Sequence, residues 1–351
     1  MSFVLAGRVA RLPSRTRARW LVPILVALAG CGANKFGEAS EGIDFTGTDA
    51  WQKLDQLPDR SNALGIQAVS LAAPLGDQLH DPCALELADG GTALYFASDA
   101  TGAIGRAYAA PGGLAWERAS SVLRATEGWE QGRVRGLSAI ERAGRFEAWY
   151  TGGDGAGIGR AVSADGVRWS KEPRTPVLVA AEAWERGSVR APAVAEAPDG
   201  RLWMAYEVGD GVALGIAVSA DGIAWTRVGP DGGGAILERG EAGTWNEARI
   251  AAPALAIEQT ATGRTVFRLW FEGMAENDFS IGEAASYDGG VWTSSPYNPV
   301  LAESPPLTLT IGADEREPWL LGKLGARQLW FATTQLDPPA QGLGVALDHS
   351  P

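Results

Sequence analysis

The sequence predicts an all-β fold, a five-bladed β-propeller with four antiparallel strands in each blade. The first observation behind this prediction is a motif of the form Ile-Gly-x-Ala-x-Ser-x-Asp-Gly-x-x-Trp. The motif occurs at residues 158–169 and 214–225, in weaker form at 281–292 and 104–116, and as a truncated copy at 343–346. Self-similarity at roughly 50–65 residues indicates supersecondary units that stack around or along an axis.

The second observation is that each copy of the motif belongs to a unit of four expected strands. An aromatic run precedes the motif and has the composition of a buried strand. The motif itself alternates small and polar residues, as the next strand would, and its Asp-Gly pair then turns the chain tightly. An apolar strand before the aromatic run and a strand opened by the Trp complete the blade. The aromatic runs lie at 94–96, 148–150, 203–206, 269–271 and 329–331.

The third observation is a common register. Trp129, Trp184 and Trp245 each stand eight residues before the opening of an inner strand. The residue just before each opening defines one position per blade, and these positions are 55, 55, 61 and 65 residues apart: Asp81, Gly136, Ala191, Ala252 and Glu317. The blades are expected over roughly 80–125, 133–179, 188–238, 249–301 and 314–351.

The first 30 residues have the grammar of a signal peptide. Arg8 to Arg19 form a basic region, and residues 20–30 form an apolar region that is too short for a stable transmembrane anchor. The segment ends Leu-Ala-Gly-Cys at Cys31, which resembles the bacterial lipobox. That resemblance implies a lipoprotein acylated at Cys31, whereas the alternative is an ordinary secretory signal. Gly32 after the cysteine favours the outer membrane, with the domain on its periplasmic face or at the cell surface.

Two further segments complete the predicted domain organisation. Residues 31–63 are polar and rich in Gly, Ser and Asp, and we interpret them as a tether between the membrane and the domain. Residues 64–351 form the propeller, which begins with an expected strand at 64–75. The fifth blade ends before its outer strand, so this N-terminal strand is expected to complete that blade and leave no open edge.

Charge and cysteine content exclude several classes of partner. The formal net charge is −12, and removal of the five leader arginines brings it to −17, which argues against a nucleic-acid partner. Without Cys31, Cys83 has no partner for a disulfide or a cysteine-based metal site, and it is expected as a buried thiol. No cofactor and no metal are predicted, although Asp154, Asp210 and Asp278 in turns leave a Ca²⁺ site as an alternative.

Several of these features together resemble a known group. The His-Asp-Pro at 80–82, the aromatic strand at 149–152, the repeated motif and the Asn-Pro-Val-Leu at 298–301 are similar to the five-bladed propeller glycosidases. That group includes arabinanases and xylosidases, invertase-like fructosidases and mannoside phosphorylases. The likeness covers residues 64–351 and is much more specific for the fold than for activity.

The resemblance implies a catalytic set of three carboxylates on the inner strands of the first three blades. These are a base or nucleophile, an auxiliary Asp and an acid Glu around the axial funnel. Asp81 matches the first, but Gly136 stands in the place of the auxiliary Asp and Arg190 in the place of the acid. Two of the three expected groups are therefore absent.

Other carboxylates offer substitutes for the missing groups. Glu317 shares the register of Asp81, and blade five adjoins blade one in a closed ring. Glu207 and Glu272 end the second strands of blades three and four, where side chains reach the funnel rim. A pair of Asp81 with Glu317 or Glu207 is the candidate catalytic set. The competing interpretation is that arginines neutralise these carboxylates; the arginines concerned are Arg135, Arg190 and Arg316.

The sequence thus supports three functional hypotheses. The first is a lipoprotein whose funnel binds a glycan or another extracellular ligand without catalysis. The second is a glycoside hydrolase with a rearranged carboxylate pair, and the third is a scaffold for another protein. The Ser-x-Asp-Gly-x-x-Trp turn also resembles the Asp-box of sialidases, but its aspartates are expected to be structural. The predicted ligand-binding residues are His80, Asp81, Arg135, Arg190, Glu272, Arg316 and Glu317.

Overall fold

The computed structural model describes residues 43, 45, 51–53, 71–72, 78–111, 116–260, 262–276, 278–302, 316–322, 327–336 and 339–348. The chain divides into two units, Met1–Lys35 and Phe36–Pro351, and all of the described residues belong to the second. The predicted signal peptide, Cys31 and most of the predicted tether lie outside the described residues. Among the described residues, no helix is long and apolar enough to cross a bilayer.

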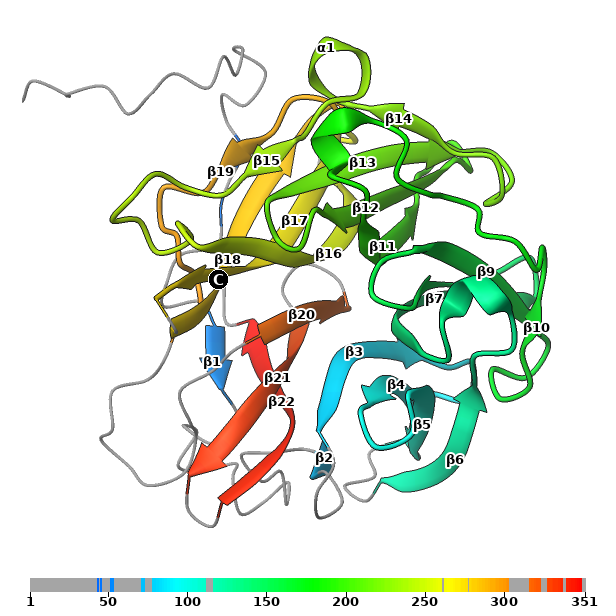
Figure 1. The fold of residues 1–351 in the computed structure, drawn as a ribbon. Coiled ribbons are helices and arrows are strands. Elements are labelled where there is room, and N and C mark those ends of the chain that lie inside the picture. Colours follow the sequence, from blue (N-terminus) through cyan, green and yellow to red (C-terminus); the bar gives the residue numbers. More distant parts are fainter. Residues whose placement is uncertain are drawn as a thin grey trace, which may run out of the picture. The chain divides into compact units, whose positions relative to one another are not determined.

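The described residues form five antiparallel sheets arranged in a ring, which confirms the predicted five-bladed β-propeller (Figure 1). Blade one contains β3 (Leu79–Glu86), β4 (Thr92–Ser98), β5 (Ala103–Ala109) and β6 (Glu117–Leu123). Blade two contains β7 (Val134–Arg142), β8 (Arg145–Gly152), β9 (Gly157–Ser163) and β10 (Ser170–Lys171). Blade three contains β11 (Val189–Glu196), β12 (Leu202–Val208), β13 (Ala213–Ser219), β14 (Thr226–Val228) and β15 (Leu237–Glu238).

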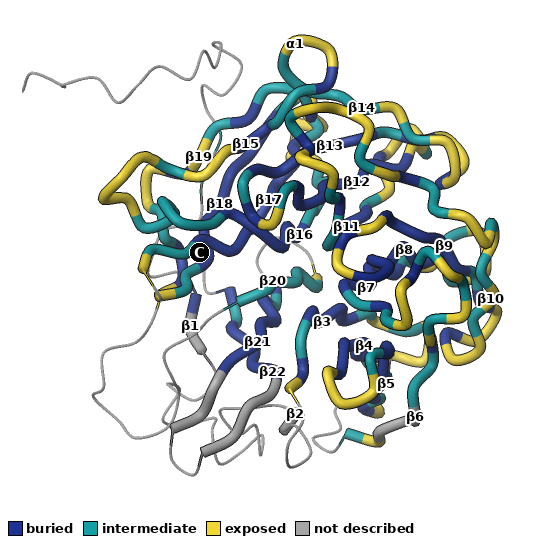
Figure 2. Tube along the Cα trace, in the orientation of Figure 1, coloured by how far each residue is buried: buried dark blue, intermediate teal, exposed yellow. Residues whose placement is uncertain are grey.

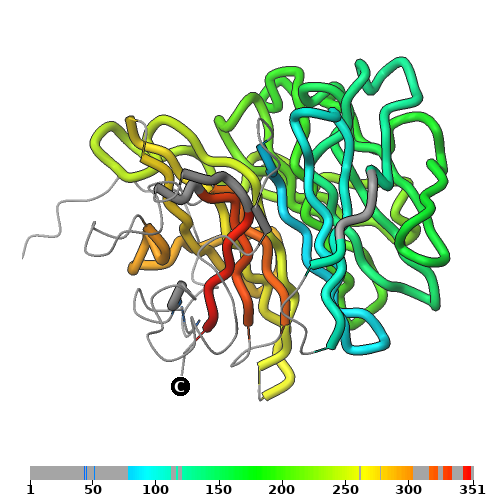
Figure 3. The backbone as a smooth tube through the Cα atoms, turned by 90° about the horizontal axis from the view of Figure 1, so that it is seen from below, coloured from blue at the N-terminus to red at the C-terminus, as the bar shows by residue number. Residues whose placement is uncertain are grey.

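The last two blades follow the same order from the axis outward. Blade four contains β16 (Arg249–Gln259), β17 (Thr265–Ala275), β18 (Asp278–Ser286) and β19 (Thr293–Ser294). Blade five contains β20 (Arg316–Leu321), β21 (Gln328–Leu336) and β22 (Pro339–Asp348), together with two short N-terminal strands. A single helical turn, α1 (Pro230–Gly233), follows β14. Figures 1 and 3 both place β3 beside the strands of blade five, so the first and last blades meet.

The N-terminal strands close the ring by pairing with β22. β2 (Leu71–Ala72), from the segment predicted for this role, pairs antiparallel with Leu343 and Gly342. β1 (Trp51–Lys53) pairs with β22 further along, with Trp51 opposite Asp348. Pairing therefore begins upstream of residue 64, within the segment that the sequence suggested as a tether. The reason is that Trp51 is a core residue, because it is buried and packs edge-on against Trp270.

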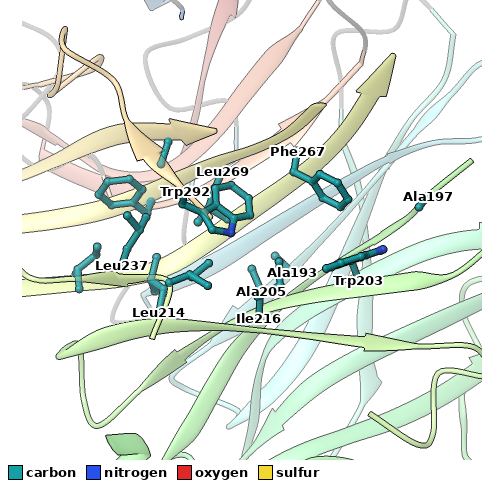
Figure 4. Packing of buried hydrophobic residues seen from close by; sticks show 14 residues of the cluster. Ala193, Ala197, Trp203, Ala205, Leu214, Ile216, Leu237, Phe267, Leu269 and Trp292 are labelled. Atoms are coloured by element: carbon teal, nitrogen blue, oxygen red, sulfur yellow. The ribbon is translucent and has the colours of Figure 1, made fainter. Parts of the chain in front are cut away.

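The hydrophobic core consists of five clusters, one between each pair of neighbouring blades. The second strands are the most deeply buried, as in β12, where every residue is buried, whereas β20 at the axis is mostly half-buried (Figure 2). Figure 4 shows the cluster between blades three and four, where the rings of Trp203 and Phe267 lie 4.8 Å apart at their centroids. Because such aromatic pairs remove large apolar areas from water, they hold neighbouring blades face to face.

The glycine of the repeated motif is required by packing. In every blade it lies directly opposite an aromatic residue of the second strand, as Gly159 lies opposite Tyr150. A Cβ atom at Gly159 would come 2.5 Å from the Tyr150 ring, closer than real Cβ contacts. The five pairs are Phe96 with Gly105, Tyr150 with Gly159, Tyr206 with Gly215, Phe271 with Gly282 and Phe331 with Gly344.

The Asp-Gly turns are structural, as predicted. In blade two the Asp165 carboxylate accepts hydrogen bonds from the backbone N–H groups of Val167 and Arg168, each 2.8 Å long. The Ser163 hydroxyl accepts one from the N–H of Gly166 at 2.9 Å. The same pattern recurs at the equivalent turns, which contain Ser219 with Asp221 and Ser286 with Asp288.

The linker tryptophans cover their blades, and the residue after each one completes a polar cluster. Glu130 follows Trp129, is fully buried, and accepts hydrogen bonds from the Tyr150 hydroxyl at 2.8 Å and from Lys171 at 2.6 Å. Glu185 after Trp184 does the same with Tyr206 and Arg227. In blade four the carboxylate and the hydroxyl are both absent, because Asn246 follows the tryptophan and Phe271 replaces the tyrosine. In blades two and three, the buried carboxylate thus occurs together with the groups that donate hydrogen bonds to it.

Cys83 is buried in β3, which confirms the prediction of an internal thiol. Burial raises the pKa of the Cys83 thiol to about 12, although its sulfur accepts a hydrogen bond from the N–H of Ala139. A thiol in this state is a packing group and not a nucleophile.

Candidate functional site

The axis of the propeller is lined by the five positions that the sequence register singled out. In each inner strand the pairing with the second strand shifts at this point, which is the signature of a β-bulge. All five residues have positive φ, with values of 49° at Asp81, 56° at Gly136, 46° at Ala191, 43° at Ala252 and 55° at Glu317. Four of them precede a proline, which has no N–H to leave unpaired at the bulge.

The axial cavity between these residues is narrow. It has a volume of about 20 Å³ and is lined by the five bulge residues and the residues that follow them. Since a water molecule needs roughly 10–15 Å³ of such space, the cavity admits one water and no sugar ring. A sugar therefore has to bind at the mouth of the cavity, where the inner strands begin.

A ring of hydrogen bonds closes around this axis. The N–H of each axial residue donates to a side chain of the preceding blade. The N–H of Asp81 donates to the Glu317 carboxylate of blade five at 2.7 Å. The N–H of Gly136 donates to the Asp81 carboxylate of blade one at 2.9 Å. The other three bonds run from Ala191 to Thr151 at 2.8 Å, from Ala252 to Glu207 at 3.2 Å and from Glu317 to Glu272 at 3.3 Å.

The acceptors of this ring occupy two alternative places in the blade. Blades one and five place a carboxylate at the axis itself. Their second strands then carry an alanine opposite the residue before the bulge, Ala97 in β4 and Ala332 in β21. Blades two, three and four have Gly or Ala at the axis, and their second strands supply the acceptor: Thr151, Glu207 and Glu272. Each blade therefore contributes one acceptor, from one place or the other.

Arginines surround these acceptors at the mouth. The Nε atom of Arg135 lies 3.3 Å from Asp81, and a terminal nitrogen lies 3.9 Å from Glu317. Because Asp81 and Glu317 favour the charged guanidinium, they raise the pKa of Arg135 despite its burial. Arg190 lies 3.6 Å from Glu207, and Arg249 lies 3.2 Å from Glu207 and 2.9 Å from Glu272. Arg135 and Arg249 therefore each bridge two ring acceptors, whereas Arg190 joins Glu207 to Asp210.

His80 joins the mouth to the rim. Its Nε2 lies 3.0 Å from Asp99 in the rim, and its Nδ1 lies 3.7 Å from Glu317. Burial alone would lower the pKa of His80, but the neighbouring Glu317, Asp81 and Asp99 outweigh it and raise the pKa. The histidine therefore favours the charged form beside Glu317.

Burial also perturbs the acids. It raises the pKa of Glu207 in spite of Arg249 and Arg190. It raises the pKa of Glu272 to about 7, and it raises the pKa of Glu317 together with the negative charge of Asp81. With a pKa of about 7, the Glu272 carboxyl can hold a proton near neutral pH, a property of general acids as well as of hydrogen-bond donors.

The structure brings most of the predicted site residues together. His80, Asp81, Arg135 and Glu317 contact one another, and Arg190, Glu207 and Glu272 continue the same network. Arg316 contacts that network least, because its guanidinium stacks on the ring of Phe279, with its central carbon 4.8 Å from the ring centroid. Their roles in ligand binding or catalysis remain predictions.

Sequence reasoning missed three residues of the network: Thr151, Asp99 and Arg249. Arg249 could have been found from the common register. Blade four has Ala251 where blades two, three and five have an arginine, and Arg249 two residues earlier supplies the missing charge. Thr151 carries no such signal, because nothing in its neighbourhood distinguishes an acceptor from an ordinary strand threonine.

Metal ligation receives no support from side-chain geometry in the described part of the chain. No three His, Cys, Asp or Glu residues there gather closely enough to hold an ion. Two of the three turn aspartates considered for Ca²⁺ face arginines instead: Asp154 lies 3.3 Å from Arg133, and Asp210 lies 3.1 Å from Arg190.

Comparison with solved structures places this fold among the glycosidases. A protein titled glycoside hydrolase matches with a TM-score of 0.62 and 15% identity, over 81% of this chain and 91% of that chain. An alpha-L-arabinofuranosidase from Lactobacillus brevis matches with a TM-score of 0.60 and 13% identity, over 79% and 92%. An alpha-L-arabinanase from Cellvibrio cellulosa matches with a TM-score of 0.54 and 14% identity, over 76% and 91%. Comparisons with protein-family models and with curated proteins gave no match.

The class of fold that these observations define is a five-bladed β-propeller, which solved glycoside hydrolases share. The expected likeness to arabinanases is confirmed for the fold. At identities of 13–15% the likeness shows the fold alone, so function has to be argued from the site. At that site Gly136 and Ala191 are axial residues without a carboxylate, and Arg190 precedes the axis in blade three.

The hydrogen-bond ring can be tested at Thr151. Replacement of Thr151 by Val keeps the shape of the side chain but leaves the partly buried N–H of Ala191 without its acceptor. We expect Thr151→Val to lower the free energy of unfolding by about 1–3 kcal/mol in urea denaturation. Thr151→Ser keeps the hydroxyl and is the matched control. Equal stability of the two variants would show that the ring bond at Ala191 contributes nothing.

The buried acid Glu272 predicts a pH dependence of stability. Its pKa is about 7 in the folded protein, above the ordinary value of 4.5 that applies to the unfolded chain. The folded state then binds the proton more tightly, so stability falls as the pH rises from about 4.5 to about 7 and is level above that. Relative to Glu272→Gln, which cannot titrate, the parent should lose on the order of 3 kcal/mol across this window.

The measurement is urea denaturation of both proteins at several pH values. Substitution of the exposed Glu241 by Gln is the control and should leave the pH profile of the parent unchanged. A constant difference between parent and Glu272→Gln from pH 4.5 to 7 would contradict the assignment.

Proposed function

We propose that this protein binds a glycan at the mouth of its propeller funnel and does not cleave it. The observation that carries the proposal is that every funnel carboxylate is already engaged. Asp81, Glu207, Glu272 and Glu317 each accept a hydrogen bond from an axial backbone N–H, and each faces an arginine. A glycosidase needs one carboxylate free to attack or to activate water and another free to deliver a proton.

The mouth has the chemistry of a sugar-binding surface. Arginine and carboxylate side chains that are held in fixed ion pairs offer both donors and acceptors to sugar hydroxyls without further ordering. The narrow axis supports binding from one side only, because it admits no sugar ring. The named neighbours of the fold, an alpha-L-arabinofuranosidase and an alpha-L-arabinanase, support a glycan as the class of ligand.

Binding can be tested with an array of plant and bacterial polysaccharides, including arabinan, followed by calorimetry on the best ligand. We expect Arg135→Gln to weaken binding by about tenfold or more, because Arg135 lies at the centre of the mouth and is one-third exposed. Arg168→Gln, in an exposed turn of blade two, is the control and should bind like the parent. Absence of binding to every glycan would refute the proposal.

Hydrolysis is a second candidate function with an observation of its own. Asp81 and Glu317 are neighbours at the axis, and burial raises the pKa of Glu317 as a general acid requires. The same polysaccharides should then release reducing sugars, and Glu317→Gln should abolish the release. Binding without release, by the parent protein at high concentration, would favour the first function over this one.

We also propose that the protein is a lipoprotein of the outer membrane, anchored through Cys31. The support is the order of basic region, apolar region and Leu-Ala-Gly-Cys in the first 31 residues. Metabolic labelling with a radioactive fatty acid should mark the parent in the membrane fraction and should not mark Cys31→Ser. Equal labelling of both proteins, or a parent found only in the soluble fraction, would refute the anchor.

A further inference from the structure

We propose that the glycan bound at the funnel mouth carries a uronic acid, and that Arg316 is the residue that binds its carboxylate. The proposal deepens the function proposed above and rests on it. It starts from a difference among the funnel arginines. Arg135, Arg190 and Arg249 all face carboxylates, whereas Arg316 has no ion pair or hydrogen bond to any residue that the structure describes.

The position of Arg316 explains why none of the described carboxylates forms an ion pair with it. It precedes the axial residue of blade five, as Arg135 does in blade two. Arg135 pairs with Asp81, the ring acceptor of the preceding blade. The corresponding acceptor for Arg316 is Glu272, whose carboxyl feels the charge of Arg316 but forms no ion pair or hydrogen bond with it; its two oxygens contact other groups. One accepts the N–H of Glu317 at 3.3 Å, and the other lies 2.9 Å from Arg249.

The second strand of its own blade offers Arg316 no acid either. The residue opposite Arg316 in β21 is Ala332, whereas the residue opposite Arg190 in blade three is Glu207. The guanidinium instead stacks on the ring of Phe279, with its central carbon 4.8 Å from the ring centroid. Stacking fixes the plane of the guanidinium and leaves the nitrogens at its edge to a ligand.

The balance of charge at the mouth agrees with an anionic ligand. Beside the axis, the described residues include four carboxylates, four arginines and His80, so the cationic groups outnumber the acidic ones by one when His80 is protonated. Burial raises the pKa of Glu272 to about 7, so this carboxyl carries less negative charge near neutral pH. The rim aspartates are half-exposed or more, so solvent and salt screen them.

A carboxylate fits this position better than a neutral hydroxyl. The Nε atoms of Arg190, Arg249 and Arg316 are all enclosed and have no hydrogen-bond partner among the described residues, so the terminal nitrogens of Arg316 are the ones that a ligand would reach. A charge-assisted bond to a carboxylate is about twice as strong as a bond between neutral groups, and the planar guanidinium can hold both carboxylate oxygens at once. A hexuronate places that carboxylate on the sugar ring, beside hydroxyls that the arginine and carboxylate pairs can bind.

The experiment compares an oligogalacturonide with its methyl ester by calorimetry. The two ligands have the same sugar ring and differ in the carboxylate charge. We expect the acid to bind the parent protein about tenfold or more tightly than the ester, with an affinity that falls as salt is added. Arg316→Gln should reduce the affinity for the acid to that for the ester, and Arg316→Lys should restore part of it.

Arg264→Gln is the matched control. Arg264 is an exposed arginine that stacks on Tyr287 at the far end of blade four, so its loss removes a stacked charge away from the mouth. It should leave both affinities unchanged. An Arg316→Gln variant that unfolds at the same temperature as the parent protein is correctly folded, and thermal unfolding measures this.

The alternative outcomes separate this inference from the function on which it rests. Equal affinity for the acid and the ester, or an Arg316→Gln variant that binds the acid as the parent does, would overturn the inference and leave glycan binding intact. If dextran sulfate competes as strongly as the oligogalacturonide, the site binds anions in general, and the assignment of a uronic acid is overturned. Failure to bind any of the arabinans, oligogalacturonides or esters would refute glycan binding itself.

Discussion

The structure depends on one constraint, which is that five backbone N–H groups at the axis need hydrogen-bond acceptors. Each inner strand bulges at the axis, and the bulge turns an N–H away from the ladder of its own blade. A buried N–H without an acceptor costs about 1–3 kcal/mol, so five of them would remove a large part of the stability of a domain. The preceding blade supplies every acceptor, and the ring of blades is thereby closed at its centre as well as at its edge.

This use of the acidic side chains limits what else they can do. Asp81 and Glu317 hold the N–H groups of blades two and one, so a reaction that protonated or alkylated them would weaken the contact between blades. The proposal of binding without hydrolysis rests on this engagement. In a hydrolase the reacting carboxylates face the substrate, and other groups have to hold the blades together.

The sequence predicted the repeat and its phase well, because both follow from local requirements that every blade shares. A glycine must face an aromatic ring, a Ser-Asp pair must close a turn, and one residue must bulge at the axis. The network at the mouth was less predictable, because it depends on differences between blades. Arg249 matters since blade four lacks an arginine at residue 251, and the pairing of Trp51 depends on where a short N-terminal strand meets β22.

The differences between blades also carry the functional argument. Arg135 contacts Asp81, the acceptor of the preceding blade, whereas Arg249 contacts both Glu207 of the preceding blade and Glu272 of its own. No described carboxylate forms an ion pair with Arg316, which stacks on Phe279 instead. Selection for specificity can act on such a position without disturbing the hydrogen bonds that close the ring.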